Sequence, residues 1–185
     1  MSEHVCPWWA GYVLANPVRR LLQDPARILR PYVARGTKAM DIGAGMGFFS
    51  LPMARLAGDA GRVVCVDLQE KMIAGLNRRA AKAGLANRID ARVCSTRSLK
   101  IDDLAGTLDF ALAFAMVHEV PDKDRLFAEI NAALKLGGRL LLCEPVGHVT
   151  RDQFAITVAL AHRAGFDVSA GPRVLFSHCT LLAKT

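Results

Sequence analysis

The sequence predicts an α/β fold built on a single doubly wound sheet whose strands are mostly parallel. Short apolar runs alternate along the chain with segments of helical periodicity, which is typical of repeated strand–helix–strand units. The chain has 185 residues and 52% of them are hydrophobic, so it suits one domain with a real core. The apolar runs span residues 39–42, 62–67, 89–94, 108–117 and 138–144.

These runs predict the strands, because most are nearly continuous in apolar residues, as strands covered on both faces are. Residues 69–84 then predict an amphipathic helix that stops at Gly84. Its apolar face would consist of Met72, Ile73, Leu76, Ala80 and Ala83.

Residues 122–138 predict a second helix of the same kind. Asp122 is suited to be its N-cap, and Gly137 and Gly138 would end it. Its apolar face would consist of Leu126, Phe127, Ile130 and Leu134. In such folds ligands bind beyond the carboxyl ends of the strands, so the functional residues are expected there.

The stretch MDIGAGMGFFS, residues 40–50, follows the first predicted strand and places glycines at alternate positions. A dinucleotide fingerprint requires a third glycine where this chain has Phe48, and no Gly-Lys-Ser/Thr follows to make a phosphate loop. What remains is the pattern D-x-G-x-G-x-G, whose glycines let the backbone bend tightly and approach a ligand. Asp41 can receive a cationic group, and Asp67, at the end of the next strand, can accept ribose hydroxyls. A ligand with these features and without phosphate is S-adenosylmethionine.

These motifs resemble those of class I S-adenosylmethionine-dependent methyltransferases over residues 35–185. MDIGAGMG resembles the first motif of that family, VVCVDLQEKM its second-strand acid motif, and LKLGGRLLLCEP the segment that leads into strand five. The tail AGFDVSAGPRVLFSHCTLLAKT resembles the closing antiparallel hairpin. FAMVHEVPDKDRLFAEINAALKLGG looks closest to the small-molecule enzymes of ubiquinone and menaquinone C-methylation. The resemblance implies a Rossmann-like sheet with an antiparallel last strand.

The resemblance also implies roles for particular residues. Asp67 would bind the ribose and Leu68 would pack on the adenine. Where the family often has an acid that holds the adenine amine, Ser95 or its backbone would serve, or the amine would be left to water. Ala115 would lie at the cofactor after the fourth strand. The methionine end of the cofactor would be held by Asp41, Gly43, Ala44, Gly45 and Gly47.

His118 is the candidate catalytic residue, because it follows an apolar strand and therefore emerges at its carboxyl edge. Methyl transfer requires the acceptor to be held in line, and removing its proton helps when it is a hydroxyl, thiol or activated carbon. Histidine titrates in the range suited to this. The alternative is a histidine that only caps the loop or packs near the cofactor. Glu119 would orient His118 or form a salt bridge.

Residues 1–34 precede the expected domain of residues 35–185 and contain Trp8, Trp9 and Tyr12. They are expected to form a helical lid, because aromatic side chains could enclose an apolar acceptor and exclude water. The alternative is a hydrophobic plug or a homodimer contact. The acceptor would be a small molecule that is apolar or aromatic.

The net charge of +7 permits a nucleic-acid partner without requiring one. The residues after the fourth predicted strand, 115–118, lack the Asn/Asp-Pro-Pro-aromatic segment of many base-amine methyltransferases, which disfavours RNA but leaves it open. A non-catalytic cofactor-binding module is the other alternative. Five cysteines without close pairing, no membrane span and no signal peptide predict a cytoplasmic protein. The histidine and cysteine spacings do not predict a metal site.

Overall fold

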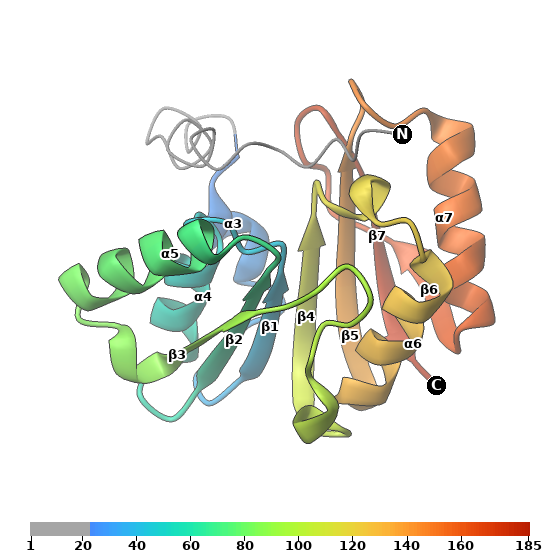
Figure 1. Cartoon of the computed structure of the whole chain (residues 1–185). Coiled ribbons are helices and arrows are strands. Elements are labelled where there is room, and N and C mark those ends of the chain that lie inside the picture. The colour runs from blue at the N-terminus through green and yellow to red at the C-terminus, as the bar shows by residue number, and fades with distance from the viewer. Residues whose placement is uncertain (1–22) are drawn as a thin grey trace. The chain divides into compact units, whose positions relative to one another are not determined.

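The computed structural model describes residues 23–185, and Figure 1 shows their helices and strands. The described part of the chain has a sheet of seven strands, β1 to β7. It confirms the predicted α/β class, with parallel strands and an antiparallel β7. The chain divides into two compact units, the first ending at Cys94 and the second running from Ser95 to Thr185.

The first unit contains three parallel strands in the order β3-β2-β1. Their bounds are Lys38–Ile42 for β1, Arg62–Asp67 for β2 and Ile89–Val93 for β3. The helical segments are α3 (Pro25–Leu29), α4 (Ser50–Ala57), α5 (Glu70–Lys82) and the short η1 (Ala86–Arg88). Helix α4 packs on β1 and β2, and α5 packs on β2 and β3. Strands β1 and β2 are therefore largely buried, as their apolar runs predicted, whereas β3 is buried only at Ile89 and half-buried beyond it.

Helix α5 confirms the predicted amphipathic helix. It buries Met72, Ile73, Leu76 and Ala80, and the chain leaves the helix through Gly84, whose φ is 68°. Only glycine adopts such an angle without strain, which is why the helix ends there.

The second unit contains four strands in the order β4-β5-β7-β6. Their bounds are Leu108–Phe114 for β4, Leu134–Pro145 for β5, Phe166–Ala170 for β6 and Ser177–Lys184 for β7. The helical segments are η2 (Asp102–Leu104), η3 (Val117–Glu119), α6 (Lys123–Ala133) and α7 (Arg151–Arg163). Helix α6 packs on β5 and on α7, which covers β6 and β7. Strands β6 and β7 form the predicted closing hairpin.

Helix α6 begins as predicted but ends earlier. The Asp122 side chain accepts a hydrogen bond of 3.0 Å from the Arg125 N–H, so Asp122 is the N-cap. The predicted end at Gly137 and Gly138 is wrong: the helix stops at Ala133 and β5 begins at Leu134, which is buried and pairs with Leu108.

Both glycines instead belong to the irregular start of β5. A Cβ at Gly138 would lie 2.8 Å from the Lys135 carbonyl oxygen, so that close approach requires glycine. Strand β4 likewise ends at Phe114, three residues before the predicted 117, because Ala115 has a φ of 57° and leaves the extended conformation.

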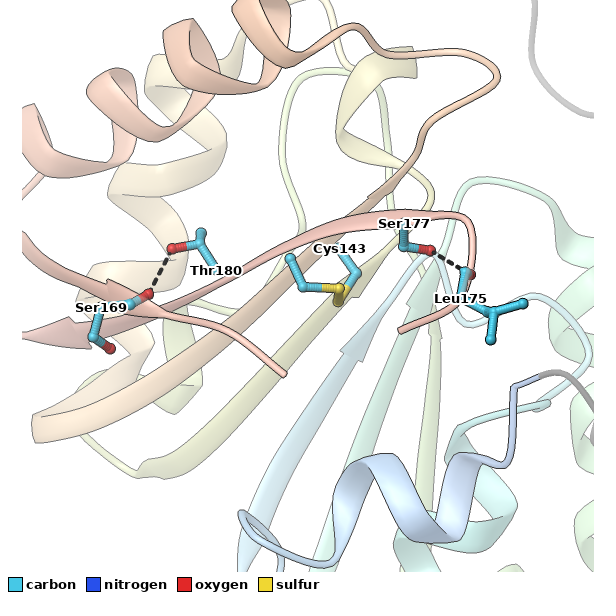
Figure 2. Close-up of a disulfide and its surroundings, with 6 residues drawn as sticks. Cys143, Ser169, Leu175, Ser177 and Thr180 are labelled. Carbon is cyan, nitrogen blue, oxygen red and sulfur yellow. Dashed lines mark hydrogen bonds between the residues drawn. A yellow bond between two sulfur atoms is a disulfide. The ribbon is translucent and has the colours of Figure 1, made fainter. Parts of the chain in front are cut away.

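Cys143 of β5 and Cys179 of β7 form a disulfide between adjacent antiparallel strands (Figure 2). The sequence predicted no pair, because 36 residues separate these cysteines and only the strand register brings their Cα atoms to 4.2 Å. Cys65 is a free thiol and is buried. The expectation of a cytoplasmic protein, which rested partly on the cysteines, stays a prediction.

The predicted lid falls largely outside the described residues, as Trp8, Trp9 and Tyr12 all do. From residue 23 onward, Asp24 caps α3 by accepting a hydrogen bond from the Ala26 N–H, and Pro25 occupies the first turn. No helix in residues 23–185 combines the length and the apolar character needed to cross a membrane.

Candidate functional site

The turn that joins β1 to α4 contains three glycines with positive φ. The φ angles of Gly43, Gly45 and Gly47 are 69°, 53° and 82°. A Cβ at Gly47 would lie 3.3 Å from Leu76 of α5, whereas a Cβ at Gly45 would have no described neighbour within 4 Å. The turn is therefore closed against the core at Gly47 and open at Gly45.

Asp67, the last residue of β2, binds this glycine turn. Its Oδ2 atom accepts a hydrogen bond of 2.9 Å from the Gly45 N–H, and its Oδ1 atom accepts one of 2.9 Å from the Gln69 N–H. Burial raises the pKa of the Asp67 carboxyl, and both hydrogen bonds oppose that rise. The carboxylate is fixed in place and keeps further lone pairs for hydroxyl donors.

Asp41 lies inside the first unit and is only 3% exposed. Its Oδ2 atom accepts a hydrogen bond of 2.5 Å from the hydroxyl of Ser50, the first residue of α4. Burial raises the pKa of Asp41 to about 7, and the nearby Asp67 adds to the rise, while the Ser50 bond lowers it. Asp41 thus ties β1 to α4, and its predicted role towards a cationic group stays a prediction.

Helix α5 supports the outer side of the turn. The Arg79 guanidinium donates a hydrogen bond to the Met46 carbonyl oxygen. A Cβ at Gly75 would lie 3.0 Å from the Met46 side chain, so a glycine at this position lets the helix approach closely. Ala44, between the first two glycines, is buried and its N–H donates to the Val66 carbonyl oxygen over 3.1 Å.

The first unit therefore offers a fixed carboxylate, an open backbone turn and an exposed apolar side chain. Leu68 supplies the last of these, with 39% of its surface exposed. These are the groups that a ribose, a close backbone contact and an adenine ring require, so the residues fit S-adenosylmethionine.

Ser95, at the start of the second unit, is engaged in its own turn. Its Oγ atom accepts hydrogen bonds from the N–H groups of Arg97 and Ser98, over 3.3 Å and 3.1 Å. A serine that makes such bonds stabilises its own turn, which explains a serine at this position. Its predicted contact with the adenine amine stays a prediction.

His118 lies in η3, just beyond the carboxyl end of β4, and is held by Glu144 at the end of β5. The His118 Nδ1 atom forms a short hydrogen bond with Glu144 Oε2. The Glu144 side chain is 2% exposed and the His118 side chain 23%. The His118–Glu144 pair thus joins a buried carboxylate to a partly exposed imidazole.

Glu144 also fixes the backbone that carries His118. Its Oε1 atom accepts hydrogen bonds from the N–H groups of Met116 and Val117, over 3.2 Å and 2.9 Å. Its Oε2 atom accepts one of 3.3 Å from the His118 N–H. One buried carboxylate therefore sets both the position of the loop and the orientation of the ring.

The electrostatics of this pair favour the imidazolium. The hydrogen bond to Glu144 raises the pKa of His118, burial lowers it, and the charges of Glu144 and Glu119 raise it further. Glu119 Oε1 lies 4.0 Å from His118 Nε2, and the ring of His148 lies 5.5 Å from the His118 ring, centroid to centroid. With Nδ1 bonded to Glu144, Nε2 is the nitrogen placed to exchange a proton.

Sequence reasoning missed Glu144 as the main partner of His118 and named only Glu119, either to orient His118 or to form a salt bridge. The available signal was that Glu144 is an acid at the carboxyl end of a predicted strand. The end of β4 lies beside Glu144 because β4 pairs with β5. A single sequence does not show that register.

Ala115 follows β4 with a φ of 57°, and its N–H donates to the Cys143 carbonyl oxygen over 2.7 Å. A positive φ is uncommon for a residue other than glycine, and such strain often marks functional positions. Its predicted cofactor contact stays a prediction. In residues 23–185, no cluster of three or more His, Cys, Asp or Glu side chains could hold a metal ion.

Comparison with known proteins agrees with these features. Residues 34–173 match a family model described as a methyltransferase domain. The chain is 34% identical over 113 residues to the ubiquinone/menaquinone biosynthesis C-methyltransferase UbiE of Cellvibrio japonicus, a match covering 60% of this chain and 44% of that protein. UbiE of Haemophilus ducreyi is 30% identical over 112 residues, covering 60% and 42%. The chain thus matches less than half the length of these relatives.

A solved structure extends the likeness to the whole fold. A SAM-dependent methyltransferase from Aquifex aeolicus superposes with a TM-score of 0.84 at 20% identity, covering 97% of this chain and 98% of that one. Because the family model spans most of the chain, the protein belongs to the methyltransferase domain family, and its fold is that of a class I S-adenosylmethionine-dependent methyltransferase, as its motifs predicted.

Proposed function

We propose that the protein transfers the methyl group of S-adenosylmethionine to a small, apolar or aromatic acceptor whose proton His118 removes. The observation that carries this proposal is the His118–Glu144 pair, in which a buried carboxylate holds an imidazole at the carboxyl end of β4. The curated relatives act, by their names, in ubiquinone and menaquinone C-methylation. That chemistry supports a small-molecule acceptor for this chain.

The cofactor would be held by residues of the first unit. Asp67 would accept the ribose hydroxyls, because its carboxylate is fixed by Gly45 and Gln69 and retains free lone pairs. The open backbone at Gly45 would allow close approach of the methionine end, and Leu68 would pack on the adenine. When bound, the sulfonium supplies the electrophilic methyl group.

His118 would supply proton removal from the acceptor. In its neutral form the ring holds the Nδ1 proton against Glu144, which leaves Nε2 as the acceptor of a proton. Glu144 then stabilises the imidazolium that forms, in a site where burial strengthens the interaction. This chemistry serves a phenol, an enol or an activated carbon, all of which become better nucleophiles on losing a proton.

The test is a screen for S-adenosylhomocysteine formation with purified full-length protein and a panel of phenols, hydroquinones, thiols and amines. We expect turnover with at least one hydroxyl or activated-carbon acceptor. His118→Gln should lose about a hundredfold or more in kcat while keeping its affinity for S-adenosylmethionine.

Two results would contradict the proposal. If His118→Gln turns over as fast as wild type, His118 is not the base. Binding of S-adenosylmethionine without turnover on any member of the panel would favour a non-catalytic binding module.

A further inference from the structure

Two loops of the second unit meet at the carboxyl end of β5 and present apolar side chains to solvent. One follows β5 and the other joins β6 to β7, and the Val146 N–H donates a hydrogen bond of 3.0 Å to the Phe176 carbonyl oxygen. Phe176 is 66% exposed, Leu175 54% and Val146 46%. These three residues are called the apolar tip below. Exposed large side chains gathered at one place mark interaction surfaces more often than scattered ones do.

The backbone at Phe176 supports a role beyond the turn itself. The Ser177 N–H donates to the Val174 carbonyl oxygen over 3.2 Å and closes a four-residue turn. Phe176 occupies its third position with a φ of 59°, where glycine or asparagine is favoured. Because a large aromatic residue is strained and exposed here, local stability does not explain its presence.

The turn is firmly mounted on the sheet. The Ser177 hydroxyl donates a hydrogen bond to the Leu175 carbonyl oxygen over 3.5 Å, as Figure 2 shows. Farther along β7, the disulfide links Cys179 to Cys143 of β5. Strand β7 is paired with β5 from Ser177 onward. The apolar tip therefore projects from a rigid support.

The charge around the apolar tip is basic. Residues 145–151 and 171–178 read PVGHVTR and GPRVLFSH, and they contain no acid. Arg151 and Arg173 are exposed. The acids nearest in sequence are Glu144, which is buried, Asp152 in the first turn of α7 and Asp167 of β6, both of which are exposed. Exposed apolar groups accompanied by arginines fit the surface of an anionic bilayer, where the apolar groups enter the boundary region and the arginines meet lipid phosphates.

We propose that the apolar tip docks the protein on anionic phospholipid membranes, with Phe176 and Leu175 inserted among the headgroups and Arg173 at their phosphates. The net charge of +7 favours the approach of the whole chain to such a surface. This docking requires no membrane-spanning helix and is independent of the methyl-transfer chemistry.

The test is co-sedimentation of the full-length protein with vesicles of phosphatidylcholine alone or mixed with phosphatidylglycerol. We expect binding to the mixed vesicles that weakens as salt rises, and weaker binding to the neutral ones. Phe176→Gly should reduce partitioning on mixed vesicles, and Leu175→Ser/Phe176→Gly should reduce it about tenfold or more. Phe176→Gly should melt no lower than wild type, since glycine relieves the positive φ.

Matched variants separate insertion from general stickiness. Leu136→Ser removes an apolar side chain that is 81% exposed near the amino end of β5, and it should bind vesicles like wild type. Arg173→Gln should weaken binding to mixed vesicles only. The proposal is overturned if wild type does not sediment with mixed vesicles, or if the double variant binds them equally well. It is also overturned if wild type is a dimer that the double variant dissociates, with vesicle binding unchanged.

Discussion

At the residue scale, the His118–Glu144 pair decides when the imidazole can accept a proton. The hydrogen bond to Glu144 raises the pKa of His118, so at neutral pH a larger fraction of the free enzyme carries the imidazolium, which cannot act as a base. The same carboxylate stabilises the imidazolium once the proton has been taken. Glu144 thus moves the acid limb of the pH–rate profile to higher pH and increases the rate on the plateau above it.

Replacing Glu144 with Gln should therefore change the pH profile in a defined direction. Loss of the negative partner lowers the His118 pKa, so the acid limb of kcat/KM should move to lower pH. The plateau should also fall, by about tenfold or more, because the imidazolium loses its partner. Steady-state kinetics across the pH range measures both effects.

Glu119→Gln is the matched control, because Glu119 Oε1 lies 4.0 Å from Nε2 and its charge contributes less to the pKa rise. It should move the limb less than Glu144→Gln does. An acid limb that stays in place in Glu144→Gln would show that His118 is not the group that titrates.

Asp41 makes the folded protein sensitive to pH. Its pKa is raised from 3.8 to about 7 in the fold, so the folded state binds a proton more tightly than the unfolded state does. The stability from this group is complete below the unfolded pKa and is lost as pH rises through the folded pKa. Asp41→Asn keeps an acceptor for Ser50 without the titration. Wild type should lose stability relative to this variant by about 1.4 kcal/mol per pH unit between about pH 5 and pH 6.5.

Urea unfolding of both proteins at several pH values measures this difference. A constant difference in unfolding free energy across that range would show that Asp41 keeps an ordinary pKa in the fold. Glu144, by contrast, illustrates the limit of sequence reasoning at this scale. Its partners, Met116, Val117 and His118, lie in the segment that follows β4, 26 to 28 residues away, and only the folded register reveals them.

At the element scale, two glycines of the turn after β1 are required for different reasons, one for packing and the other for ligand binding. Gly45 and Gly47 both have positive φ, but only Gly47 is packed, 3.3 Å from Leu76. Gly45→Ala should lower stability by only about 1–2 kcal/mol, the cost of the left-handed backbone. Its new methyl group should occupy the open side of the turn and weaken S-adenosylmethionine binding by about tenfold or more.

Gly47→Ala is the comparison, since its methyl group also presses on Leu76 and Leu51. Gly47→Ala should lose at least as much stability as Gly45→Ala. For the same loss of stability, its affinity for S-adenosylmethionine should fall less. Thermal melting and calorimetry on both variants measure these two quantities. If Gly45→Ala keeps wild-type affinity, the open side of the turn does not face the cofactor.

Periodicity predicted the helices and strands well where one local signal dominates. The N-cap at Asp122 and the stop at Gly84 are both local features, and both are confirmed. The end of α6 was misplaced because Gly137 and Gly138 resemble a helix stop. The chain instead leaves the helix at Leu134, which is buried and pairs with Leu108 of β4. Tertiary pairing, which local patterns do not contain, decided that boundary.

At the scale of the whole molecule, the order of the motifs along the sequence predicted the family. The pairing of strands and cysteines far apart in the sequence could not be predicted. The glycine turn, Asp67 and the closing hairpin occur in the expected sequence, and the sheet confirms their arrangement in each unit. The Cys143–Cys179 disulfide was not predictable, because it depends on the register of β5 with β7. The covering of the acceptor by residues 1–34 stays a prediction.

The net charge leads to a prediction about RNA. Several basic side chains are engaged in ion pairs, such as Arg88 with Asp59, Lys135 with Asp109 and Arg163 with Asp124. We therefore expect only weak RNA binding, with a dissociation constant above about 1 µM at physiological salt. Filter binding with a structured RNA over a range of salt concentrations tests this. Submicromolar affinity at physiological salt would overturn the small-molecule acceptor.

The most direct measurement of the central claim is calorimetric titration of the full-length protein with S-adenosylmethionine, with a nicotinamide dinucleotide as the competing class of ligand. We predict that S-adenosylmethionine binds and the nicotinamide dinucleotide does not. Asp67→Ala should weaken that binding by about 1.5–3 kcal/mol, as expected for lost hydrogen bonds to a charged group. Asp59→Ala, which removes a side chain that is 85% exposed, should bind like wild type. Equal affinity in wild type and Asp67→Ala, or binding of the dinucleotide in place of S-adenosylmethionine, would contradict the account.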